Sequence, residues 1–250
     1  MGTCTGAAVQ GGERLAADGA WARWGVAAAV TGMLAWVVGV ALIPSDAKLE
    51  KGEQHLDQVL RAHTGQLYAA ALLAVLSAVL LVAFAAVLTR LVPEGYPGWV
   101  LLRVSLAGCV ITQTMVAVGA CFALAAVHAA AGSTAAGLVI LGWRALRLTF
   151  QASAVPTVLF TVTAVLGLRR AGLSPPLVSA LGLLSAAAHL LVLFTLAQRG
   201  AFAPDGIIAA LVPLTTVIWM LGPSRHTATI AVGSRQAYRR SLWVTRSSTQ

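Results

Sequence analysis

The sequence predicts an all-α protein of the polytopic membrane class, a bundle of six transmembrane helices with both termini in the cytoplasm. Hydrophobic residues make up 58% of the 250 residues and charged residues only 10%, and the mean hydropathy is +0.84. Most of the chain therefore has to be surrounded by lipid. About 20 apolar residues in a helix cross the roughly 30 Å core of a bilayer, and several such windows occur. Their continuous Ala, Leu and Val runs lack the alternation of a membrane barrel, which leaves helices.

Charged and turn-forming residues divide the apolar sequence into six spans. The first ends at Pro44, the second at Arg90 and the fourth at the pair Arg169 and Arg170. The fifth follows two prolines, which break the preceding helix, and the sixth is short and contains a proline. The predicted spans are 24–43, 67–88, 104–126, 148–168, 177–197 and 206–222, within one transmembrane domain, 23–222.

The distribution of Lys and Arg predicts the orientation, because these residues are retained on the cytoplasmic side. Eleven fall in the segments that would lie inside and six in those outside. The Gly- and Ala-rich segment 1–22 has no signal-peptide pattern and is expected to be a disordered cytoplasmic leader. The basic, aromatic tail 223–250 is expected to contact anionic lipids. We expect the chain to lie in the cell inner membrane. Its net charge of +9 is then explained by the basic residues retained on the cytoplasmic side and in the tail, and no nucleic-acid partner is expected.

Two polar side chains are expected near the middle of the membrane, where an ionisable group is costly and hence a candidate for function. They are His189 in the fifth span and Gln113 in the third. Equal depth would allow a hydrogen bond between them if their helices touch. The hydroxyl of Ser185 is a nearer hydrogen-bond partner, because it lies one turn from His189 on the same helix face. Two alternatives therefore stay open for His189: it is a hydrogen-bonded packing residue, or it takes part in substrate or proton handling.

A haem b group is a further alternative. Two imidazoles at matching depth on facing helices would be needed, and His63 and His128 would both lie at the outer ends of the second and third spans. No other cofactor is expected. No metal site is expected either, because no carboxylate or thiolate completes a ligand set within the membrane.

The predicted outer face carries most of the remaining polar residues. Residues 44–66 are typical of an amphipathic helix at the membrane interface. Glu53, Asp57 and Arg61 recur every four residues and would stack on its polar face. The apolar side would consist of Leu49, Leu56, Val59 and Leu60.

A second polar stripe is predicted opposite this helix. Arg144, Arg147 and Gln151 recur at three and four residues, and their expected partners are Asp57 or Asp205. The arginines either snorkel to headgroups or bind an anionic headgroup or a diphosphate. We expect these groups to form one outward-opening pocket. Its lining would be Asp57, His63, Arg147, Gln151 and Asp205, with His189 and Gln113 at the floor.

Two classes of function stay open. The first is a small permease, an efflux or immunity component, or an accessory membrane protein, with an apolar small molecule as its possible partner. The second is a membrane-embedded enzyme that acts on an isoprenoid, polyketide or lipid by acid catalysis, in the manner of small terpene cyclases. Asp57, His63 and Glu53 would then be catalytic, and the other pocket residues with Arg144 would bind substrate. The sequence has no Walker loop, HExxH or GxSxG motif, which argues against an ATP-driven pump or a soluble-type hydrolase.

Three short motifs carry a resemblance. They are HLDQVLRAHTGQL (55–67), RRAGLSPPLVSALGLL (169–184) and FAPDGIIAALVPLTTVIW (202–219). In these the chain resembles a family of actinobacterial six-helix integral membrane proteins grouped as a domain of unknown function, over residues 24–222. A Trp commonly follows the loop proline of the second motif, whereas this chain has Pro176 and Leu177 there. The resemblance implies a fold and no activity.

Overall fold

The computed structural model describes residues 4–47, 52–92, 94–132 and 136–196, and this part of the chain is entirely helical apart from its turns and connections. Four segments are long and apolar enough to cross a membrane: Arg23–Ala41, Thr64–Arg90, Trp99–Ala131 and Gly137–Arg170. The helices are α1 (Cys4–Ala41), α2 (Glu53–Ala62), α3 (Thr64–Arg90), α4 (Trp99–Ala131), α5 (Ala136–Ala152), α6 (Ala154–Arg170) and α7 (Pro176–Leu196).

The first three predicted spans coincide with α1, α3 and α4, and the fifth with α7. Two boundaries differ. Helix α1 begins at Cys4, within the segment for which composition predicts disorder. The predicted fourth span, 148–168, lies within a longer apolar helical segment that starts at Gly137 and continues through Arg144 and Arg147. The predicted sixth span lies outside the described residues.

Helices α5 and α6 follow one another with only Ser153 between them. Pro156 has no N–H to donate to the carbonyl of Ala152, so the helical hydrogen-bond ladder is interrupted here. The Ser153 hydroxyl instead donates to the Phe150 carbonyl at 2.6 Å, and the Thr157 hydroxyl donates to the Ser153 carbonyl at 2.7 Å. The break allows the two halves to pack differently along α4.

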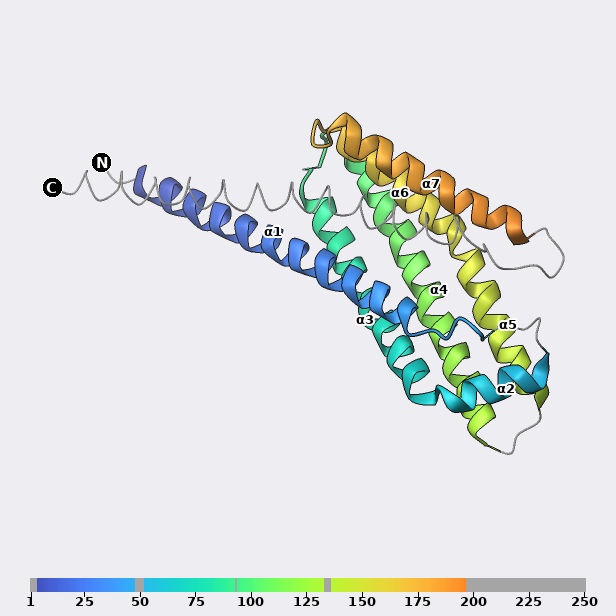
Figure 1. Ribbon diagram of the computed structural model, residues 1–250. Helices are drawn as coiled ribbons and strands as arrows, with labels where there is room; N and C mark the ends of the chain where they lie inside the picture. Colours follow the sequence, from blue (N-terminus) through green and yellow to red (C-terminus); the bar gives the residue numbers. More distant parts are fainter. Residues whose placement is uncertain (1–3, 48–51, 93, 133–135, 197–250) are drawn as a thin grey trace.

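The long helices pack in an up-and-down order, which Figure 1 shows. Helix α1 packs against α3, α3 against α4, α4 against both α5 and α6, and α6 against α7. The short helix α2 lies across the lower ends of α3, α4 and α5 in this view and contacts all three.

Glycines permit the close approach of α1 and α3. Gly25, Gly32 and Gly39 recur every seven residues, and a Cβ at each would meet Val87, Leu80 and the Ala70 carbonyl in turn, at 2.7, 3.1 and 3.3 Å. Small residues at such spacing bring membrane helices together, where van der Waals packing rather than the hydrophobic effect drives association. This glycine repeat also fixes α1 and α3 as antiparallel neighbours.

Candidate functional site

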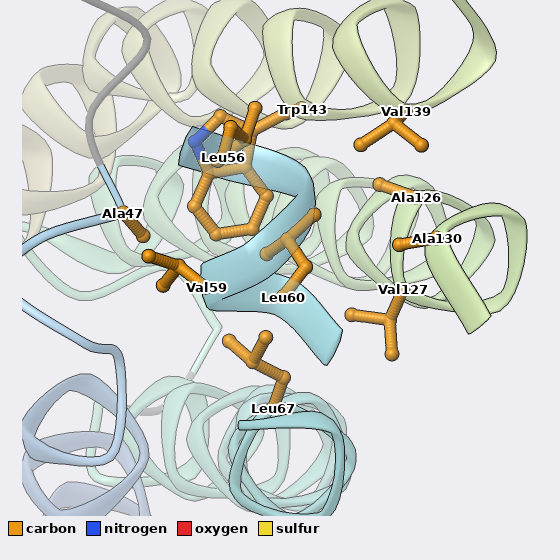
Figure 2. Packing of buried hydrophobic residues seen from close by; sticks show 10 residues of the cluster. All are labelled: Ala47, Leu56, Val59, Leu60, Leu67, Ala126, Val127, Ala130, Val139 and Trp143. Carbon is orange, nitrogen blue, oxygen red and sulfur yellow. The ribbon is translucent and has the colours of Figure 1, made fainter. Parts of the chain in front are cut away.

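Helix α2 is amphipathic, as predicted, but its apolar face packs against protein. Leu56 and Leu60 are 0% exposed and Val59 is buried. Their cluster, shown in Figure 2, takes in Val139 and Trp143 from α5 and extends to α4 and α3. Burial of this kind stabilises by roughly 1.5–3 kcal/mol per large side chain. Helix α2 is therefore a cap on the bundle, and the predicted Leu49 contact lies outside the described residues.

Two residues on the polar face of α2, Asp57 and Arg61, form an ion pair with each other. The Arg61 Nε donates to the Asp57 carboxylate at 2.8 Å, four residues apart, and both side chains are partly exposed. Exposed pairs of this spacing contribute about 0.3–0.5 kcal/mol. Glu53 begins the helix and is exposed. Asp57, an expected partner of the α5 arginines, thus has Arg61 as its ion partner.

His63 stands at the junction of α2 and α3, where its Nδ1 donates to the Gln66 side-chain oxygen at 2.8 Å. His128 is exposed on the last turn of α4. Within the described ranges, no group of three or more His, Cys, Asp or Glu residues could hold a metal ion. Both histidines lie at the end of the bundle that α2 covers.

The three polar residues of the predicted stripe on α5 become more buried along the helix. Arg144 is exposed, Arg147 is half-buried, and Gln151 is only 4% exposed. Asp205, the other carboxylate expected here, lies outside the described residues. The structure confirms that these three side chains share one side of α5, as their spacing predicts.

His189 and Gln113 belong to helices that α6 separates. Helix α7 packs mainly on α6, and α6 packs on α4. The His189 Nδ1 lies 2.8 Å from the backbone carbonyl of Ser185, so this nitrogen carries the proton and donates it to the carbonyl. The sequence predicted a contact with the Ser185 hydroxyl, and the hydrogen bond described here goes to the backbone carbonyl of the same residue.

Hydroxyl groups form the polar contact between α4 and α6 instead. The Thr112 and Thr157 hydroxyls lie 3.3 Å apart, and the Ser105 hydroxyl donates to the Phe160 carbonyl at 3.1 Å. A Cβ added at Gly108, between them, would come within 2.8 Å of the Phe160 nitrogen. This contact was not predicted, although Ser105, Gly108 and Thr112 occupy one face at spacings of three and four residues.

The site prediction missed an apolar crevice within the bundle. It has a cavity volume of about 90 Å³ and lies between α1, α3, α4 and α5. The only hydrogen-bonding groups on its lining side chains are two indole N–H groups. The lining residues are Trp36, Gly39, Val40, Ile43, Leu67, Ala70, Ala71, Ala74, Val116, Ala120, Ala123, Trp143, Leu146 and Phe150.

The crevice runs along the bundle axis for about seven residues of each helix, or roughly 10 Å. Gly39 meets α3 at Ala70, and Gly142 meets α4 at Ala126, which sets the relative heights of the helices. Ile43, Leu67, Ala123 and Trp143 accordingly mark the end under α2, whereas Trp36, Ala74, Val116 and Phe150 mark the deeper end. The crevice could have been anticipated from the small residues that recur on the facing sides of α3 and α4, because such residues leave space between helices.

No protein-family model, curated protein or solved structure matches this chain. Function has to be argued from the crevice, the α2 cap and the polar contacts themselves. The crevice combines internal volume with an apolar lining on four helices, which is the usual form of a small-molecule site.

Proposed function

We propose that this chain is a multi-pass protein of the cytoplasmic membrane that takes up an apolar small molecule from the bilayer, as a small permease, an efflux or immunity protein, or an accessory subunit would. The crevice between α1, α3, α4 and α5 carries the proposal. It is apolar on all four helices and large enough to admit part of a hydrocarbon molecule. In a chain of this hydropathy such a molecule arrives from lipid rather than from water.

The exposure of the lining supports lateral entry. Val40, Ile43 and Phe150 line the crevice and are still 43–44% exposed on the outside of the bundle. Side chains that face both the lipid and the crevice would make a continuous apolar path between them. Helix α1 packs chiefly on α3. The gap through which a lipid-borne molecule could enter the crevice therefore lies on the side of α1 that faces away from α3.

The position of the carboxylates favours binding over acid catalysis. A general acid has to lie within hydrogen-bond reach of its substrate. Asp57 is paired with Arg61 on the exposed side of α2, Glu53 is exposed, and neither lines the crevice. An apolar molecule in the crevice would therefore meet no carboxylate from the described part of the chain.

We further propose six spans with both termini inside, and a basic tail on anionic lipids. Support comes from the end of the bundle opposite α2, where α3 and α6 end at Arg90 and Arg170 and where Arg103 lies in the first turns of α4. Arg90 stacks over the Trp21 ring at 4.3 Å, and Arg103 lies 5.2 Å from the Trp99 ring. Basic and aromatic residues concentrate in this way at a cytoplasmic membrane interface.

The test compares cells with and without the gene by untargeted mass spectrometry of cell extract and medium. A mass redistributed between cells and medium is expected. Complementation with Val116→Trp, which would fill the crevice, should abolish the redistribution, whereas Val118→Trp on the exposed side of the same helix should preserve it. A new compound formed or consumed would instead establish an enzyme, and equal activity of both variants would remove the crevice from the function.

A further inference from the structure

Trp143 carries a hydrogen-bond donor with no acceptor. Its side chain is 4% exposed, and its Nε1 is one of three buried side-chain polar atoms without a partner among the described residues. An indole nitrogen only donates, and buried donors are almost always satisfied. An unpaired one at the wall of a cavity therefore points to a missing acceptor.

Trp143 is shared by the crevice and by the hydrophobic cluster under α2. In Figure 2 the indole nitrogen lies on the side of the ring toward Ala47, where the chain leaves α1, and away from Val139. Ile43, four residues before Ala47, lines the same end of the crevice.

We infer that the crevice holds the acyl chain of a membrane glycerolipid, with the ester carbonyl accepting a hydrogen bond from Trp143 Nε1–H and the chain extending toward Trp36 and Phe150. This rests on the proposed function and names the chemical class of its ligand. The unpaired donor lies at the end capped by the polar helix α2. The lining at the deeper end is apolar apart from the Trp36 indole, whose nitrogen is not one of the buried unpaired atoms of the described residues. An ester-linked acyl chain has the same order of groups along its length.

Water fits the site less well than a carbonyl. A buried water needs two to four polar partners, and the lining side chains offer only the indoles of Trp36 and Trp143. A carbonyl oxygen needs one donor, and its carbon chain replaces the remaining contacts with apolar ones. Because Nε1 has almost no accessible surface, an entering chain has to displace an apolar side chain at this end.

The test observes indole N–H groups by NMR in full-length protein carrying ¹⁵N-labelled tryptophan. The protein is placed in nanodiscs of diphytanoyl phosphatidylcholine, which has ester carbonyls, or of the matching diphytanyl ether lipid, which has none. Trp143→Phe assigns the Trp143 signal, and Trp36→Phe is the matched control. The Trp143 indole proton should lie downfield in the ester lipid, and the Trp36 proton should move less.

A titration in the ether nanodiscs separates this inference from the proposed function. Methyl decanoate and n-undecane are added, and the Trp36 signal reports binding. Trp143→Phe should weaken methyl decanoate binding about 2- to 10-fold, the range of one neutral hydrogen bond, and leave n-undecane unchanged. Equal Trp143 shifts in both lipids with no ester-specific loss would overturn the carbonyl assignment and leave the crevice as a hydrocarbon site. If neither compound perturbs Trp36, the crevice takes no apolar ligand, and the proposed function fails with it.

Discussion

Replacing Gly108 with alanine should loosen the contact between α4 and α6. The added Cβ would lie 2.8 Å from the Phe160 nitrogen and 3.1 Å from both the Phe160 Cα and the Pro156 carbonyl oxygen. All three are backbone atoms, so no side-chain rotation relieves the clash. Ordinary contact begins at 3.4 Å, so the two helices have to separate by about 0.6 Å.

The expected loss follows from three contributions. Overpacking a well-packed contact costs about 1–3 kcal/mol, and the nearby Ser105 bond to the Phe160 carbonyl would weaken, at about 0.6 kcal/mol for a bond between membrane helices. The gain in helix propensity from Gly to Ala offsets at most about 1 kcal/mol. The free energy of unfolding should therefore fall by about 0.6–2.6 kcal/mol, which lowers Tm by roughly 1–10 °C in a chain of this size.

Thermal unfolding of purified protein in detergent, read by tryptophan fluorescence, measures this loss. Gly137→Ala is the matched control, because a Cβ there meets nothing within 4 Å. Its Tm should stay within error of the parent or rise slightly. A Gly108→Ala variant as stable as Gly137→Ala would refute the close contact of α4 and α6.

Three further predictions concern the polar and capping residues. Leu60→Ala should lower the free energy of unfolding by about 2–5 kcal/mol, because Leu60 is fully buried on the apolar face of α2, and proteolysis in the connection before Glu53 should accelerate. Asp57→Asn should change stability by no more than about 0.5 kcal/mol in denaturant titrations, since the pair with Arg61 is exposed. His189→Leu should leave expression and the gene's phenotype unchanged, because the ring bonds only to its own helix among the contacts described above.

Each of these has an opposite result that would count against the reasoning. A mild Leu60→Ala effect would mean that α2 rests on lipid rather than on α4 and α5. A large Asp57→Asn effect, or loss of the redistributed mass, would place this carboxylate at the functional site. Loss of phenotype in a well-expressed His189→Leu variant would support proton handling.

Hydropathy predicted the membrane-spanning helices at α1, α3 and α4 and an apolar helix at α7, because a run of apolar residues long enough to cross lipid has few alternatives. It did not predict that the helical segment of the fourth span starts as early as Gly137, because Arg144 and Arg147 were taken as the membrane boundary although the helix continues through them. The spacing of Asp57 and Arg61 likewise predicted a shared face, and the ion pair followed from local geometry alone.

The crevice could not be predicted in the same way. Lipid-facing and crevice-facing residues are chemically alike in this chain: Val116 lines the crevice, and Val118, two residues on, faces outward. Only the relative rotation of four helices separates them, and rotation depends on contacts such as Gly39 on Ala70. The unpaired Trp143 nitrogen is equally invisible in sequence, where a tryptophan near a helix end indicates an interface.

The glycine repeat on α1 has a consequence for control of the crevice. Because α1 packs chiefly on α3, the distance between these two helices sets how far the crevice stands open toward the lipid. Gly25 and Gly32 touch Val87 and Leu80, side chains that can rotate, whereas Gly39, at the crevice itself, faces the Ala70 carbonyl. Helix α1 therefore meets backbone beside the crevice and side chains at its far end, so the contact at Gly39 fixes the distance between α1 and α3 where the crevice lies.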